Sequence, residues 1–109
     1  MTHSASPIDW HQRAQDLRPD GQLLIDGLRC NAQDGASFDK HSPIDGRRLG
    51  AVARGQSADI NAAVKAARNA FEQRRWCGQP PAARKRVLLR WAELIRAHGE
   101  ELALLETLD

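Results

Sequence analysis

The two cysteines are the candidate nucleophiles of this 109-residue chain. A cysteine reacts as the thiolate, and the neighbouring Arg74 and Arg75 would favour that form of Cys77. A thiol nucleophile also needs a base, and no histidine or carboxylate lies within a few residues of Cys30 or Cys77. The pair is too sparse for a disulfide framework and matches no metal spacing. We therefore expect two reduced, structural cysteines and no catalytic residue.

The histidines are the second group that could do chemistry, because imidazole binds metals and moves protons near neutral pH. His98 precedes Gly99 and is explained more simply as a favourable charge at a helix end. The four positions share no metal-ligand spacing: His3, His11, His41 and His98. The sequence therefore predicts no metal site built from histidine side chains.

A basic run in the last third of the chain could contact phosphates. It lies opposite the apolar residues Val87, Leu88 and Trp91, as the solvated side of an amphipathic helix would. Acidic residues follow closely, and no helix-turn-helix or zinc pattern accompanies it. We therefore expect a solvent-exposed face and no nucleic-acid partner. The run consists of Arg84, Lys85, Arg86, Arg90 and Arg96.

Composition supports an ordinary globular protein. Hydrophobic residues make up 41% and charged residues 28%, and the net charge of +2 is too small to indicate a nucleic-acid or membrane surface. The N-terminus has neither the basic nor the apolar region of a signal peptide. No apolar run approaches the roughly 18 residues of a membrane span. We expect a cytoplasmic protein with no membrane contact.

The N-terminal half is expected to hold one short helix and then hairpins. Ser6 is a candidate N-cap with Pro7 in the first helical position, and the helix should end before Gly21. From residue 22 onward, short apolar runs alternate with turn dipeptides such as Asp26-Gly27, which favours a tight hairpin. The expected strands cover residues 23–25, 28–30, 38–41 and 49–53.

The second half is expected to be helical. Ser57 is a candidate cap, with Asp59 in the first turn, and an apolar stripe runs from Ile60 to Phe71. A second helix is expected from about Pro81 to His98, with its apolar stripe from Val87 to Ile95. Gly99 should end it, and a third helix should start at Glu100-Glu101. That helix carries leucines to the penultimate residue without a glycine stop or basic last turn, which predicts an N-terminal fragment of a longer protein.

Five motifs follow one another in the order of a known family. Residues 24–27 resemble its "F-I-N-G" hairpin, and residues 37–46 resemble its "T-F…N-P-x-T-G" stretch. Residues 55–71 resemble "G-x-x-A-D-V-D-x-A-V-x-A-A-R-x-A-F", and residues 76–88 resemble the "W…R…L" helix. Residues 101–109 are nearly identical with "E-L-A-x-L-E-T-L-D". By these motifs the chain resembles the aldehyde dehydrogenase family.

The resemblance covers residues 22–109 in unbroken order and, less distinctively, the helix around Trp10. It implies an α/β fold, in which a β-hairpin segment followed by helices forms an incomplete part of the Rossmann-type cofactor-binding domain. Residues 1–21 would be an N-terminal helix and linker. The Trp10 helix and the wording of residues 102–109 lean toward the subgroup that oxidises aminoaldehydes from polyamine breakdown, such as γ-glutamyl-γ-aminobutyraldehyde dehydrogenases.

The family's chemistry needs a thiolate, a carboxylate base, donors for the oxyanion and a nicotinamide that accepts the hydride. The resemblance implies that the full-length enzyme is an oxidoreductase using NAD or NADP on an aldehyde, and that it is a homo-oligomer. The family's catalytic cysteine, glutamate and asparagine motifs and its cofactor-binding lysine motif do not occur here. We therefore expect no catalytic or cofactor-binding residue in these 109 residues, and no activity from the chain alone.

One site of the family has counterparts in this sequence. Many aldehyde dehydrogenases bind a monovalent cation through backbone carbonyls before the N-P dipeptide and through the aspartate that ends E-T-L-D. The matching positions are Lys40 and His41, through their carbonyls, and Asp109. Lys40 departs from the usual small or β-branched residue, and its ammonium would compete with the ion. The alternative is that Asp109 is simply a charge at the chain end.

Two other functions remain open at this point: a non-catalytic binding or assembly module, and a small basic nucleic-acid-binding protein. Reduction of NAD(P) with an aminoaldehyde tests the enzyme, and salt-dependent DNA binding tests the nucleic-acid binder. The apolar stripes of the two long helices are expected to pack partly on each other and partly on absent sequence. The isolated chain should then be marginally stable and prone to associate.

Overall fold

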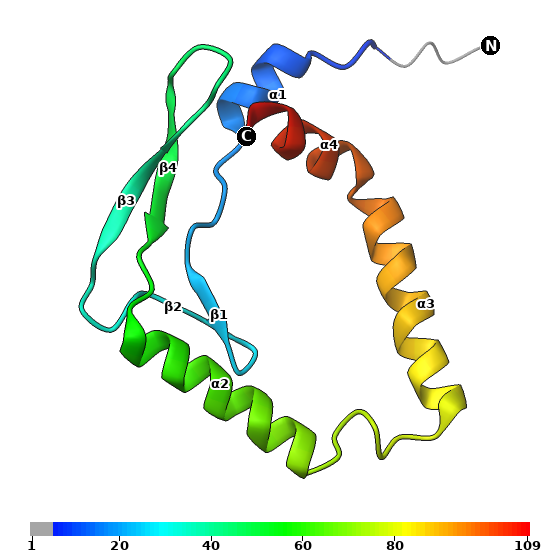
Figure 1. Cartoon of the computed structure of the whole chain (residues 1–109). Coiled ribbons are helices and arrows are strands. Elements are labelled where there is room, and N and C mark those ends of the chain that lie inside the picture. Colours follow the sequence, from blue (N-terminus) through cyan, green and yellow to red (C-terminus); the bar gives the residue numbers. More distant parts are fainter. Residues whose placement is uncertain (1–5) are drawn as a thin grey trace, which may run out of the picture.

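The structure is a computed structural model that describes residues 6–109, so His3 lies outside the described residues. One short helix, two hairpins and three further helices follow one another along the chain (Figure 1). This is the expected α/β order of hairpins followed by helices. The elements are α1 (Trp10–Asp16), β1 (Leu23–Ile25), β2 (Leu28–Cys30), β3 (Ser37–His41), β4 (Arg48–Ala53), α2 (Ser57–Glu72), α3 (Pro81–Ala97) and α4 (Gly99–Leu108).

Helix α1 starts later than the sequence predicts. Its N-cap is Asp9, whose carboxylate accepts a hydrogen bond from the backbone N–H of Gln12 at 3.0 Å, so the assignment of Ser6 as cap was wrong. Asp9 is the cap because its side-chain oxygen lies three residues before a free backbone N–H and accepts a hydrogen bond from it. Arg13, from this helix, makes an exposed ion pair with Glu100 of α4 at 2.6 Å, which links α1 to the C-terminal helix.

The first hairpin confirms the turn prediction. β1 and β2 pair antiparallel, with Leu23 opposite Cys30 and Ile25 opposite Leu28. Asp26 and Gly27, which connect the strands, have φ angles of 53° and 75°. An aspartate tolerates this left-handed region and a glycine adopts it freely, so an Asp-Gly pair favours this turn.

The second hairpin, β3–β4, is longer, and the segment before β1 runs along β4. Phe38 pairs with Val52, and the register shifts between Lys40 and His41 at the far end of the ladder. On the other side of β4, the carbonyl of Gly21 accepts a hydrogen bond from the Ala53 N–H at 2.7 Å. The chain there passes so close to β4 that only a residue without a side chain fits.

The junction of α3 and α4 differs from the prediction. His98 interrupts the helical geometry between the two helices, and Gly99 is the first residue of α4 instead of the end of α3. The His98 carbonyl accepts from the Leu102 N–H at 2.9 Å, so the chain re-enters a helix immediately. The expected boundary was therefore placed one residue late.

The apolar core is small: two of its residues lie on α4, beside α1 and the turn after β3, and the third lies in the loop after β2. Among the described residues, the buried hydrophobic side chains are Ala32, Leu104 and Leu108. The radius of gyration is 18.8 Å, whereas a compact domain of this length has about 13 Å. The elements surround an opening and form a flat plate of 55 × 41 × 18 Å (Figure 1).

The two long helices do not pack on each other, which corrects the prediction that their apolar stripes would pack partly on each other. Helix α2 packs on the hairpin strand β1, and α3 contacts α4. The half-buried residues of α2 are the small Ala63, Ala66 and Ala70, while its larger apolar residues Val64 and Phe71 are 61% and 67% exposed. The periodicity identified an apolar stripe, but its large side chains stay exposed among residues 6–109.

Candidate functional site

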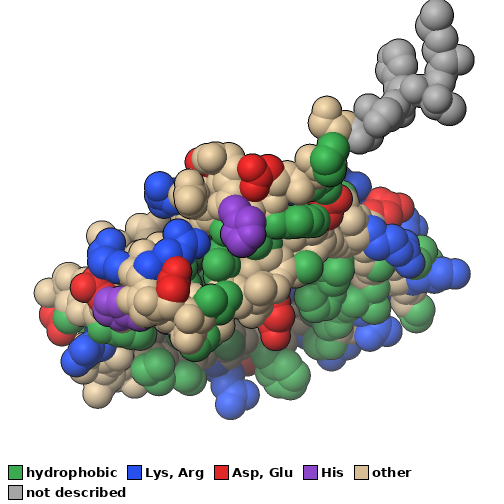
Figure 2. All heavy atoms as spheres, turned by 90° about the horizontal axis from the view of Figure 1, so that it is seen from above, with side chains coloured by type: hydrophobic (Ala, Val, Ile, Leu, Met, Phe, Trp, Pro, Cys, Tyr) green, Lys and Arg blue, Asp and Glu red, His purple; other side chains and the backbone are tan. Residues whose placement is uncertain are grey.

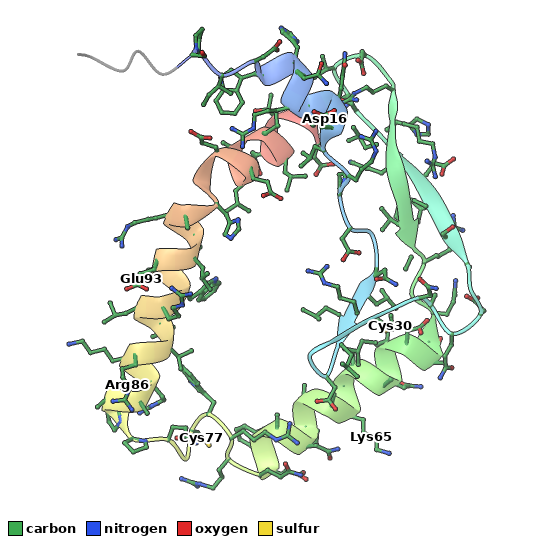
Figure 3. All side chains as sticks on the ribbon, turned by 180° about the vertical axis from the view of Figure 1, so that it is seen from behind. Asp16, Cys30, Lys65, Cys77, Arg86 and Glu93 are labelled. Atoms are coloured by element: carbon green, nitrogen blue, oxygen red, sulfur yellow. The ribbon has the colours of Figure 1, made fainter. Side chains whose placement is uncertain are left out.

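The two thiols are separated in space as well as in sequence. Cys30 is half-buried at the end of β2, and Cys77 is exposed in the loop between α2 and α3. Figure 3 shows Cys30 beside the start of α2 and Cys77 beyond the other end of that helix. Both are free cysteines, and no histidine or carboxylate is hydrogen-bonded to either. They do not form a nucleophile–base pair.

The described histidines do not converge. His11 and His41 are exposed, and His98 lies 3.7 Å from Glu101 through Nδ1, at the start of α4. Within residues 6–109, no three side chains of histidine, cysteine, aspartate or glutamate gather as metal ligands would. None of the helices in that range has the length and apolar character to cross a membrane.

The structure brings two of the three predicted cation-site residues together directly. Lys40, near the end of β3, makes an ion pair with the carboxylate of Asp109, 69 positions later, and both side chains are largely exposed. His41 follows at the irregular end of the β3–β4 ladder, where the Ser42 N–H donates to the Arg47 carbonyl at 2.9 Å. The carboxylate that would bind a free cation therefore already has an ammonium as its partner.

This ion pair stands at the rim of a cavity between the second hairpin and α4. The cavity has a volume of about 540 Å³. Its walls are mainly apolar, with contributions from both strands and from one face of the helix, so it offers few polar groups to fix a ligand. The apolar side chains that line it are Phe38, Leu49, Val52, Leu102, Leu105 and Leu108.

Asp59 is a buried carboxylate, only 5% exposed, in the first turn of α2. It accepts the backbone N–H of Gln56 at 2.8 Å and that of Gln33 at 2.9 Å, so it ties the loop after β2 to the start of the helix. These two hydrogen bonds, led by that from Gln56, hold the pKa of Asp59 below its usual value. Gln56 is the N-cap and completes a capping box with Asp59, so Ser57 is not the cap.

The lowered pKa of Asp59 predicts an acid-sensitive contact. A carboxylate with a depressed pKa in the folded state contributes stability above its unfolded pKa near 3.8, and that contribution is lost as pH falls below it. We expect the backbone amide shifts of Gln33 and Gln56 to titrate together below pH 3.8 in NMR spectra. In Asp59→Asn the shared titration should disappear. Independent titration of the two amides, or titration that persists in the variant, would contradict the assignment.

The fold gives the structural class, and the comparison with known proteins gives the family. Two hairpins are followed by three helices, so this is an α/β segment. The sequence model of the "Aldehyde dehydrogenase family" matches residues 30–109. The chain belongs to the aldehyde dehydrogenase family, as its motifs predicted.

Named relatives agree with the family model. The chain is 43% identical over 100 residues to the NADP/NAD-dependent aldehyde dehydrogenase PuuC of Escherichia coli K12, covering 92% of this chain and 20% of that protein. It is 44% identical over all 109 residues to phenylacetaldehyde dehydrogenase of Pseudomonas fluorescens, covering 22% of that protein. The crystal structure of γ-glutamyl-γ-aminobutyraldehyde dehydrogenase from Burkholderia cenocepacia J2315 superposes with a TM-score of 0.89 at 54% identity, covering 92% of this chain and 20% of that one.

The chain thus spans about a fifth of the length of the relatives it matches. Over that fifth the hairpins and helices have the same arrangement as in the solved relative. The open shape is therefore a property of this part of the aldehyde dehydrogenase fold.

Proposed function

We propose that this chain is the N-terminal structural part of an enzyme that oxidises an aldehyde to a carboxylic acid with NAD or NADP. The observation that carries the proposal is the family match over residues 30–109, together with the 0.89 TM-score to a solved family member. The substrate class we propose is an aminoaldehyde, of the kind formed in polyamine catabolism. The names of the Burkholderia and E. coli relatives support aldehyde chemistry and NADP/NAD dependence respectively.

Within that enzyme, we assign residues 22–109 to the cofactor-binding domain and residues 1–21 to an N-terminal helix and linker. The contacts of Arg13 with Glu100, and of the Arg47 guanidinium with the Ala14 carbonyl at 2.9 Å, support a role of α1 as a strap across the domain. We also propose a cytoplasmic location, which the two free cysteines support. The full-length protein is proposed to be a homo-oligomer, on the basis of its family.

A chimera tests the proposed function. The segment of the P. fluorescens relative that aligns with all 109 residues is replaced by this chain, and oxidation of phenylacetaldehyde is followed by reduction of NAD or NADP. We expect activity from the chimera and none from the 109 residues alone, since neither Cys30 nor Cys77 has a base beside it. An inactive, well-folded chimera would refute the proposed role, and so would activity from the chain alone.

We further propose that Lys40, His41 and Asp109 form the family's monovalent-cation site, and that the Lys40 ammonium takes the place of the free ion. The Lys40 ammonium already neutralises the Asp109 carboxylate, so the residues as they stand leave no unpaired carboxylate for a free ion. In this proposal the backbone carbonyls of Lys40 and His41 complete the set of oxygen ligands, as a hard cation requires. The strand irregularity between these two residues supports it, because in a regular ladder one of two consecutive carbonyls is hydrogen-bonded to the partner strand.

Replacing Lys40 should make the protein respond to potassium. In the chimera carrying Lys40→Met, the freed Asp109 carboxylate can bind K⁺, and binding to the folded state alone stabilises it by about 1 kcal/mol at a concentration several times the Kd. We expect the melting temperature of this variant to be higher in KCl than in tetramethylammonium chloride of equal ionic strength. The chimera with Lys40 intact should melt equally in both salts. Equal melting of the variant in the two salts would contradict an ion site here.

A further inference from the structure

We propose that the turn of the first hairpin is a modification site, at which Asp26 converts spontaneously to isoaspartate. The proposal goes beyond aldehyde oxidation and holds whatever reaction the longer enzyme catalyses. It starts from the dipeptide Asp-Gly, which occurs four times in the sequence and whose surroundings differ from one copy to the next. The four pairs are Asp20-Gly21, Asp26-Gly27, Asp34-Gly35 and Asp45-Gly46.

Asp-Gly favours this reaction because glycine has no side chain to hinder its own amide nitrogen. That nitrogen loses its proton to the solvent, attacks the Cγ atom of the aspartate and forms an N–Cγ bond. The Cγ–OH bond of the protonated carboxyl group breaks, and the hydroxyl leaves as water with the proton that the amide lost. Water then opens the five-membered succinimide ring. Opening at the main-chain carbonyl gives isoaspartate, in which the backbone runs through Cγ, and no group is oxidised or reduced.

At Asp26 neither reacting group is held. Within residues 6–109, no hydrogen bond engages the Asp26 carboxylate or the Gly27 N–H. The carboxylate has one ion pair, with Arg75 at 3.8 Å, and both side chains are more than half exposed, so this pair is weak. The strand pairing closes at Ile25 and Leu28, outside the reacting pair. The amide nitrogen and the carboxyl group are therefore both free to react.

The Asp34 turn differs in both reacting groups. The Gly35 N–H donates to the Ala32 carbonyl at 2.8 Å, and the Asp34 carboxylate accepts from the Ala36 N–H at 2.9 Å. The amide must release its proton before the nitrogen attacks, and a hydrogen-bonded amide proton exchanges slowly with solvent. Ring closure also removes the negative charge that strengthens the second hydrogen bond. Both hydrogen bonds therefore oppose the reaction.

The Asp45 turn repeats this arrangement. The Gly46 N–H donates to the Ser42 carbonyl at 2.8 Å, and the Asp45 carboxylate accepts from the Arg47 N–H at 3.0 Å. Exposure does not separate the turns, since Asp26 and Asp45 are both exposed. On the face that Figure 2 shows, acidic side chains are interspersed with basic ones, so no acidic patch there marks one turn. The difference lies in the local hydrogen bonds.

Asp20 is held through its carboxylate. That group accepts the Gln22 N–H at 2.8 Å and forms an ion pair with the guanidinium of Arg29. The neighbouring Gly21 lies against the backbone of Ala51, which leaves no room for the chain to turn as the ring closes. Of the four pairs, Asp26-Gly27 is thus the one in which neither the nucleophile nor the carboxyl group is restrained.

Isoaspartate at position 26 should loosen the first hairpin. A two-residue turn of this kind needs positive φ at both central residues, as Asp26 and Gly27 have. A residue whose backbone runs through Cγ adds an atom to the turn and cannot reproduce that geometry. The tip of the hairpin lies beside α2 (Figure 1), and α2 packs on β1. In the modified chain, both the pairing of Ile25 with Leu28 and the contact with α2 should weaken.

Ageing the 109-residue chain at neutral pH tests the proposal, because the four sites are compared within one molecule. The chain is digested after storage, and isoaspartate at each site is quantified by electron-transfer mass spectrometry. We expect it to accumulate at least about tenfold faster at Asp26 than at the other three sites, since hydrogen bonds of ordinary net strength must be lost there. In urea, where all four sites are free, the rates should converge.

A variant and a second sample serve as controls. Asp26→Glu cannot close a five-membered ring, so the product at position 26 should disappear while the other sites are unchanged. Circular dichroism checks that the helices persist during storage, and the chimera is aged in the same way to hold the fold if they do not. Equal rates at the four sites of the folded protein would overturn the proposal. So would a preference for Asp26 that persists in urea, and neither result depends on whether the chimera is active.

Discussion

Gly21→Ala is expected to detach the segment before β1 from the edge of β4. A Cβ atom on Gly21 would overlap the carbonyl oxygen of Ala51 and lie 2.8 Å from the Cα of Val52, and both neighbours are backbone atoms that cannot rotate away. Overpacking of this kind costs about 3 kcal/mol. The hydrogen bond from the Ala53 N–H to the Gly21 carbonyl should then open, and hydrogen exchange of that amide should rise roughly a hundredfold.

Gly50→Ala, in β4 itself, is the matched control. The nearest atom to a Cβ on Gly50 is the carbonyl oxygen of Pro19 at 3.8 Å, an ordinary contact, so this substitution should leave the exchange of Ala53 unchanged. If the Ala53 amide exchanged as slowly in Gly21→Ala as in the unmodified chain, the close approach of the two segments would be wrong. If that amide exchanged as fast in Gly50→Ala as in Gly21→Ala, the effect would come from the loss of a glycine in general.

The local elements could be predicted from the sequence because their signals are local. An Asp-Gly pair between two apolar triplets specifies the β1–β2 turn, and the helical periodicity from Ile60 to Phe71 specifies α2. The family followed from motifs in fixed order, and the model match over residues 30–109 confirms it. The same local signals placed helix ends with less success, since Asp9 and Gln56 compete as caps with the nearby serines.

The contacts between distant segments could not be predicted in the same way. Asp59 has the spacing of a capping box, which was a readable signal, but its second donor, Gln33, is 26 residues away and has no sequence mark. The close approach of Gly21 to β4 likewise depends on where the chain crosses the hairpin, so Gly21 was interpreted only as a helix breaker. Such contacts depend on how distant segments are arranged in space, and the residue pattern of one segment does not specify that arrangement.

The apolar stripes of α2 and α3 also depend on contacts that the sequence does not specify. Periodicity tells that one face of a helix needs a partner, and both α2 and α3 carry such a face. It does not specify which surface will cover that face, so the part of the expectation in which the two helices cover each other was wrong. An aldehyde dehydrogenase segment that is one fifth of its relatives' length can be rich in apolar periodicity and still bury few large side chains.

Leu104→Ala is expected to disrupt the small core that α4 forms with α1. Leu104 and Leu108 are the large buried side chains of α4, and they line the contact with α1 and the turn after β3. Truncating a buried leucine to alanine costs about 3 kcal/mol, a loss that a chain with so little buried apolar surface cannot offset. We expect α1 to detach, so that the indole N–H resonance of Trp10 moves to the position of an unstructured peptide.

Leu102→Ala on the same helix provides the comparison, since Leu102 is 45% exposed and its truncation in the 109-residue chain removes little buried surface. The Trp10 resonance should stay in place in that variant. A second comparison is Glu100→Gln, which weakens the exposed ion pair with Arg13 and should cost less than about 1 kcal/mol. Detachment of α1 by Glu100→Gln, with α1 still docked in Leu104→Ala, would mean that the ion pair and not the buried leucine holds the strap, because the two contributions act on the same helix.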